Sequence, residues 1–151
     1  LTMTASNWLA LAGVLIILAL ATYAFVLWRK VLARKAEQQA LAVERNQRLA
    51  GDIIILANSL LDGQLPMIEG SIRIKVLLDN YYGPRRADLD IGIFERIYDA
   101  TAHIPTHQGW KDLPKAERTL HEQQMQTLER DHKEAVFEAA RNISRGLGHP
   151  A

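Results

Sequence analysis

The chain has 151 residues, a formal net charge of +1 and no cysteine. The lack of cysteine excludes a disulfide framework, a thiol nucleophile and a cysteine-ligated zinc site. Residues 1–28 carry no charged side chain, residues 29–50 carry six basic and two acidic ones, and the remainder carries 12 basic and 15 acidic ones. The basic character is confined to one short segment, which argues against a nucleic-acid partner.

The first expected element is an apolar helix from Trp8 to Trp28. This stretch has no charged residue, and it has the length of about 20 residues that the hydrocarbon core of a bilayer requires. Trp8, Tyr23 and Trp28 lie toward its ends, where aromatic rings prefer the headgroup region. We expect residues 1–28 to be an N-terminal transmembrane anchor. Because the span contains no ionisable side chain, an ion or proton pathway through it is not expected.

The basic residues that follow the span predict its orientation. Arg29, Lys30, Arg34 and Lys35 come directly after it, and no basic residue precedes it. The positive-inside rule then places the short N-terminus outside and the following domain in the cytoplasm. The same four side chains are candidates for contact with anionic lipid headgroups, so a lipid-surface sensor is a further hypothesis.

Residues 29–50 contain neither Pro nor Gly, and we expect them to continue the span as a basic juxtamembrane helix. Gly51-Asp52 is predicted to break this helix, with Asp52 as the N-cap of a short core helix over residues 53–61. Asp62-Gly63 is predicted to end that helix with a left-handed residue. Residues 51–146 form the expected cytoplasmic helical domain, and residues 147–151 a disordered tail.

The segment from Met67 to Tyr82 has an ambiguous period. Apolar residues alternate with Arg73 and Lys75 over residues 71–78, as in a strand, whereas Ile68 and Ile72 share one helix face. Glu69 and Arg73 would form a favourable pair one helical turn apart. A single hairpin would be marginal, so we favour the helix, and the strand stays the alternative.

The rest of the chain indicates two more helices. Asp88 is a candidate N-cap for a helix that Pro105 closes, residues 106–114 form a loop with Trp110, and residues 115–145 lack Pro and Gly. The expected fold class is therefore all-α: one N-terminal transmembrane helix, a basic neck helix, and a small cytoplasmic bundle of about four helices.

No motif in the sequence specifies chemistry. His103 and His107 are separated by Pro105, and the single Glu129-x-x-His132 lacks the second copy that a di-iron bundle needs. Asp88-x-Asp90 is explained by capping. We assign no catalytic, metal or cofactor-binding residue and expect no cofactor. A membrane-anchored metal-binding protein or enzyme that uses the domain's histidines is the alternative function; these are His103, His107, His121 and His132.

Two features favour a protein partner. Tyr81, Tyr82, Arg85 and Arg86 stand together at a predicted helix end, and Trp110 lies among polar neighbours. Tyr, Trp and Arg are enriched at binding hot spots. In the alternative interpretation the tyrosines cover the core and Trp110 closes the mouth of the bundle. We expect a non-catalytic, membrane-tethered interaction module that binds a protein partner or a second copy of itself.

The order of these features resembles a family of short bacterial single-pass membrane proteins of unknown function. The residues that carry the resemblance are the uncharged N-terminal span, the block from Ser59 to Asp79 with Glu69-Gly70-Ser71-Ile72-Arg73 at its centre, and the distal Trp110 followed by a polar helix. The resemblance implies a bacterial inner-membrane protein with a cytoplasmic domain. It implies no activity and no site residue.

Overall fold

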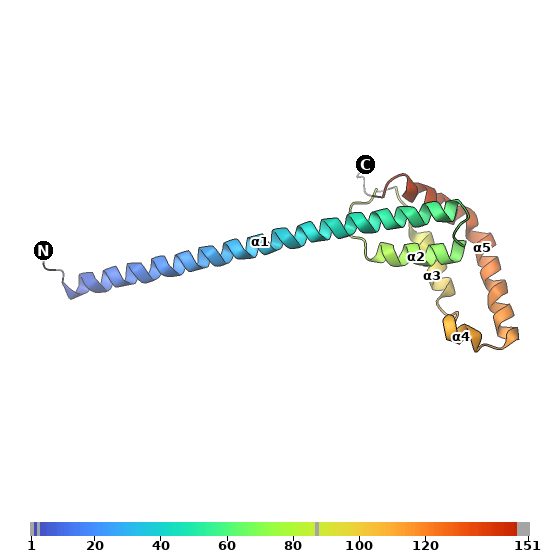
Figure 1. Cartoon of the computed structure of the whole chain (residues 1–151), viewed down its shortest axis with the longest axis horizontal. Coiled ribbons are helices and arrows are strands. Elements are labelled where there is room, and N and C mark those ends of the chain that lie inside the picture. The colour runs from blue at the N-terminus through green and yellow to red at the C-terminus, as the bar shows by residue number, and fades with distance from the viewer. Residues whose placement is uncertain (1, 3, 87, 148–151) are drawn as a thin grey trace. The chain divides into compact units, whose positions relative to one another are not determined.

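The computed structural model describes residues 2, 4–86 and 88–147, and within them the chain has five helices and no strand. Figure 1 shows these helices in chain order. They are α1 (Ala5–Leu61), α2 (Met67–Asp79), α3 (Gly92–Thr101), α4 (His107–Lys111) and α5 (Lys115–Ser144). The predicted all-α class, with a long apolar N-terminal helix, is confirmed.

The chain divides into two compact units, Leu1–Val43 and Glu44–Ala151, and α1 contributes to both. In the first unit every large apolar side chain from Trp8 to Val43 is exposed. Within the described residues, α1 is the one helix long and apolar enough to cross a membrane by length and composition. The second unit contains the hydrophobic core.

The predicted helix break at Gly51-Asp52 is wrong, because α1 runs through both residues without interruption. An interior Gly costs about 1 kcal/mol relative to Ala, but it does not end a helix by itself. Ile53, Ala57 and Leu60 are buried at helical spacing directly after Gly51, and this burial more than offsets the cost of the glycine. The expected core helix is therefore the final part of α1, and the second unit begins at Glu44 rather than at residue 51.

The predicted stop at Asp62-Gly63 is confirmed. Gly63 has a φ of 74°, a left-handed conformation that costs least in glycine. The N–H groups of Gln64 and Leu65 donate to the Ser59 carbonyl oxygen at 3.0 and 3.2 Å. The turn sends α2 back along the end of α1 (Figure 1), and the Tyr82 N–H donates to Asn46 Oδ1 at 3.2 Å.

The ambiguous segment 71–78 is helical, as favoured, because it lies inside α2. The buried residues of α2 recur every three or four positions; they are Met67, Gly70, Ser71, Ile74 and Leu78. The Ser71 hydroxyl donates to the Met67 carbonyl oxygen at 2.7 Å, so this buried polar group is satisfied. Glu69 and Arg73 form the predicted ion pair, with 2.5 Å between Oε1 and Nη2.

Two predictions about the following segment are wrong. α3 begins at Gly92 and not after Asp88; the side chain that accepts near its start is Asp90, whose Oδ1 takes the Gly92 N–H at 3.0 Å. The predicted loop 106–114 contains the short helix α4, whose first residue, His107, has a φ of 51°. The helix predicted over residues 115–145 is observed as α5.

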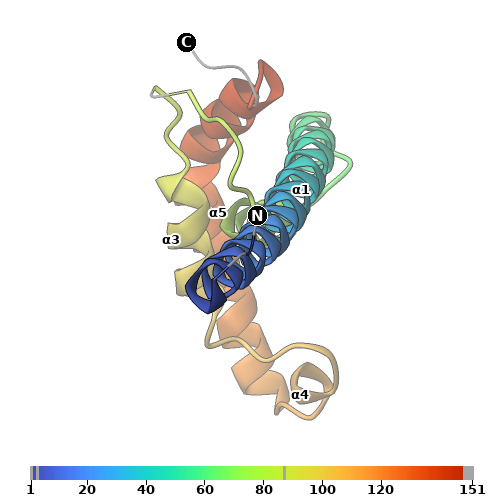
Figure 2. The ribbon, with the colours of Figure 1, turned by 90° about the vertical axis from the view of Figure 1, so that its left-hand side faces the viewer.

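The core of the second unit is formed where the end of α1, α2, α3 and the C-terminal half of α5 meet. α3 packs against both α2 and α5, and Figure 2 shows α3 beside α5. Phe94 is the largest fully buried side chain. Leu147, the first residue of the predicted tail, is fully buried in this core. Residues 148–151, the rest of the predicted tail, lie outside the described residues.

Candidate interaction surfaces

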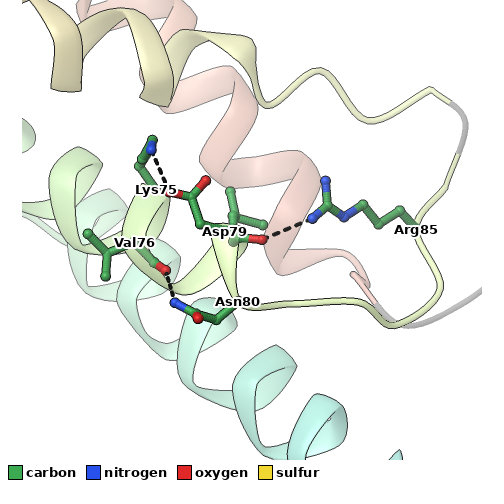
Figure 3. Close-up of polar contacts among 6 residues, drawn as sticks. Lys75, Val76, Asp79, Asn80 and Arg85 are labelled. Carbon is green, nitrogen blue, oxygen red and sulfur yellow. Dashed lines mark hydrogen bonds and ion pairs between the residues drawn. The ribbon is translucent and has the colours of Figure 1, made fainter. Parts of the chain in front are cut away.

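The predicted Tyr-Arg cluster follows the C-terminal end of α2, and Figure 3 shows one of its members, Arg85, pointing toward that helix end. Arg85 Nη2 donates to the carbonyl oxygens of Leu78 and Tyr81, at 3.0 Å each. Asn80 Nδ2 donates to the Val76 carbonyl oxygen at 2.8 Å. The last carbonyls of a helix have no partner within the helix, so these side chains stabilise the end of α2.

Tyr81 belongs to the core, with 2 % of its surface exposed. Its hydroxyl donates to the Pro84 carbonyl oxygen at 2.7 Å, and the Arg85 guanidinium lies 5.7 Å from its ring centroid. Burial raises the pKa of the Tyr81 phenol, and the positive charge of Arg85 acts in the opposite direction. Tyr82, by contrast, is 78 % exposed.

Arg86 joins the segment after α2 to α5. Its Nη2 donates to the Asn142 carbonyl oxygen at 2.8 Å, and its Nε lies 3.6 Å from Asp88 Oδ1. Both arginines therefore have intramolecular roles, and contact with a partner remains a prediction for Tyr81, Tyr82, Arg85 and Arg86.

Trp110 lies apart from this cluster. It is half-buried on α4 and lines a small cavity with Ile68 and Ile72 of α2. Ile68 and Leu78 are ten residues apart on α2, which corresponds to about 15 Å along the helix. The structure therefore does not join Trp110 and the Tyr-Arg cluster into one surface.

The four predicted lipid-contacting residues lie on the first unit of α1. Arg29, Lys30, Arg34 and Lys35 are all exposed. The Arg29 guanidinium lies 6.0 Å from the ring centroid of Phe25, and such a contact lets the side chain keep its apolar stem along the helix. Contact with anionic lipid remains a prediction.

The structure brings His103 close to His121, a pair that their spacing in the sequence does not indicate. His103 Nε2 and His121 Nδ1 both lie within hydrogen-bond distance of Gln124 Oε1, at 3.4 and 3.3 Å. Their ring centroids are 5.7 Å apart, and Trp110 lies 6.3 Å from the His121 ring. His103 lies in the turn after α3 and His121 lies in α5, and no sequence signal pairs these two residues, which are 18 positions apart. Over the described stretches, no three or more His, Asp or Glu side chains are grouped to hold a metal ion.

A groove that sequence reasoning missed lies between the first half of α2 and the middle of α5. It has a volume of about 560 Å³ and is lined by Ile68 and Ile72 from α2 and Met125 from α5, with carboxylates at its edge. The same three apolar residues, with Trp110, border an adjoining space of about 240 Å³. Apolar pockets of a few hundred Å³ are the usual form of binding sites.

These features define a class: an all-helical protein with a long apolar N-terminal helix and a small helical unit that has its own core. The family described as "Protein of unknown function (DUF2489)" matches residues 17–143, and the chain belongs to this family. The expected membership of an uncharacterised family is thereby confirmed. No curated protein and no solved structure matches the chain significantly.

Proposed function

We propose that this chain is a single-pass protein of the bacterial inner membrane, with its N-terminus outside and its second unit in the cytoplasm. The observation that carries this proposal is the uncharged segment of α1 from Trp8 to Trp28. All of its large apolar side chains are exposed, and they lie on every side of the helix. A helix that is apolar all round needs an apolar environment on every side, and a bilayer supplies one.

The energetics favour insertion. Leu, Ile, Phe and Val each contribute about −0.3 to −0.6 kcal/mol near the centre of a transmembrane helix. No charged residue opposes them before Arg29. Arg29, Lys30, Arg34 and Lys35 then supply the positive flank that retains the following domain in the cytoplasm.

The second unit acts, in this proposal, as a non-catalytic interaction module. Its core gives it a stable surface, and the anchor confines that surface to the plane of the membrane. Confinement raises the effective concentration of a weakly binding partner in the same membrane. The exposed Tyr82, three residues before the exposed Arg85 in the chain, is a candidate contact on this module.

Fractionation and cross-linking test the two halves of the proposal separately. The full chain should stay in the membrane fraction after washes with high salt and alkali, and detergent should release it. A photoreactive residue at position 82 should cross-link to a protein in intact membranes, whereas one at the buried position 94 should not. Recovery of the chain in the soluble fraction contradicts the anchor, and a stoichiometric bound metal in the purified protein contradicts the non-catalytic module.

A further inference from the structure

The groove between α2 and α5 is lined by apolar side chains that the core covers only in part; of these, Ile68 also packs against the core. Ile68, Ile72 and Met125 are each half-buried and line it together. Met125 also borders a second space of about 440 Å³, which lies between the end of α3 with its following turn and α5 and is lined by Ile104 and Leu128. The middle of α5 is thus incompletely covered at both spaces.

The burial pattern along α5 shows where close packing ends. The buried residues of α5 are Val136, Ala139, Ala140 and Ile143, all in its C-terminal half. Before them, half-buried side chains recur every three or four residues; they are Arg118, His121, Met125, Leu128 and His132. This spacing matches the seam along which helices pack against one another. The first half of α5 therefore retains a helix-packing face that its own chain covers only in part.

The edge of the groove is acidic. Glu69, Glu122 and Glu129 border it, with Arg73 as the one basic lining residue. Arg73 is paired with Glu69, and within the described residues neither Glu122 nor Glu129 has an ion-pair partner. Because these two carboxylates are seven residues apart, they lie on the same face of α5, about 10 Å apart along its axis. This charge repels an anionic lipid surface or a nucleic acid.

We propose that this groove binds a helix of a partner protein that presents an apolar stripe flanked by Lys or Arg side chains. The apolar stripe would cover Ile68, Ile72 and Met125, and the basic flanks would meet Glu122 and Glu129. An amphipathic helix that lays its apolar face into a groove is a recurring mode of recognition. The inference deepens the proposed interaction module and rests on it, because it assigns the module a binding site and a class of partner.

The test uses the full chain in nanodiscs of neutral phosphatidylcholine and a displayed library of 18-residue helical peptides. Each peptide has a fixed Leu stripe, and its flanking positions are randomised among Lys, Arg, Glu, Gln and Ser. Peptides that bind empty nanodiscs are removed. The variant pair is E122K/E129K in the groove, and the matched control is E134K/E138K, which makes the same charge change at exposed positions outside the groove lining.

Selected peptides should be enriched in Lys and Arg at the flanks. Their affinity should fall at least about fivefold in E122K/E129K, weaken with added salt, and remain unchanged in E134K/E138K. Failure to select any peptide that distinguishes the two variants, or enrichment of Glu or neutral flanks, overturns the groove proposal. Cross-linking from position 82 in intact membranes would still support the interaction module in that case, so the two failures are distinguishable.

Discussion

Both units of this chain are helical, but large apolar side chains are exposed in the first unit and form a buried core in the second. In the first unit, Ile16, Ile17 and Leu18 are all more than half exposed, whereas Ile53 and Leu60 of the same helix α1 are fully or almost fully buried. The difference does not lie in residue type. It lies in what surrounds the helix. In the second unit, other helices pack against one face of the end of α1, whereas in the first unit no other described element packs against α1.

This contrast teaches that one helix can satisfy two environments through the distribution of its charges. Trp8 to Trp28 has no charge, so every face suits lipid. From Glu44 onward the helix has one buried stripe and, apart from the exposed Ile55, mostly polar residues at its exposed positions, which suits a protein core on one side and water on the other. Changes in one unit should therefore leave the other unit's behaviour intact, and each of the following predictions tests that separation.

The largest expected effect is in the core of the second unit. Phe94→Ala should destabilise that unit by about 3–5 kcal/mol, because it removes a fully buried aromatic side chain and leaves a cavity. Amide hydrogen exchange of the C-terminal half of α5, measured on the full chain in nanodiscs, should accelerate accordingly. Membrane association should not change. Loss of membrane association in this variant would contradict the separation of the two units.

A charge in the apolar segment should reduce membrane association and leave the core of the second unit intact. Leu18→Arg places a guanidinium near the middle of the span, at a cost of about 2.5–3.5 kcal/mol for insertion. The membrane-bound fraction should fall, while hydrogen exchange in α5 stays as in the parent chain. Leu18→Ile is the matched control and should fractionate normally. Equal membrane association of both variants would argue that the segment is not in lipid.

The contact between α1 and α2 should be sensitive to a single methyl group. A Cβ at Gly70 would lie 2.8 Å from Leu60 Cδ1 and 3.0 Å from Leu65 Cδ2. Gly70→Ala should therefore destabilise the second unit by about 1–3 kcal/mol through overpacking, as measured by hydrogen exchange in α2 and α5. Gly51→Ala meets no atom within 4 Å and is the control that should not destabilise the helix.

The smallest effect concerns Tyr81. Tyr81→Phe removes the hydrogen bond to the Pro84 carbonyl oxygen and should cost about 1 kcal/mol. Since burial raises the pKa of this phenol above its ordinary value of 10.0, the folded state holds the proton more tightly than the unfolded state does. Its contribution is present below pH 10 and is lost as the pH rises through the raised pKa.

Stability profiles measured above pH 10 should therefore fall less steeply in Tyr81→Phe than in the parent chain. Tyr82→Phe changes an exposed side chain and should leave the profile unchanged. Identical profiles for the parent chain and Tyr81→Phe would contradict the role given to burial.

Much of the fold follows from local signals in the sequence. Three elements are indicated by a pattern within the segment itself, and the structure has all three. They are the apolar helix up to Trp28, the turn at Gly63 and the helix over residues 115–145. The continuity of α1 through Gly51 did not follow, because packing of Ile53 and Ala57 outweighs the local preference of glycine. Asp90 rather than Asp88 accepts at the start of α3, a distinction that depends on backbone geometry.

The candidate sites were harder to predict than the helices. Tyr81 and Tyr82 are adjacent and of one type, yet one is buried and the other exposed. The approach of His103 and His121 depends on how the turn after α3 packs against α5, and the groove beside Met125 depends on how α2 packs against α5. Such tertiary proximity leaves no spacing pattern in a single sequence.

The central claim, that α1 crosses a membrane with the second unit inside, is tested most directly by cysteine labelling. The chain has no native cysteine, so Ser6→Cys, Leu18→Cys and Gln47→Cys each report one position. In spheroplasts, an impermeant maleimide should label position 6 at once, position 47 after permeabilisation, and position 18 in neither condition. Rapid labelling of position 18 in intact spheroplasts or in native membranes would contradict the account.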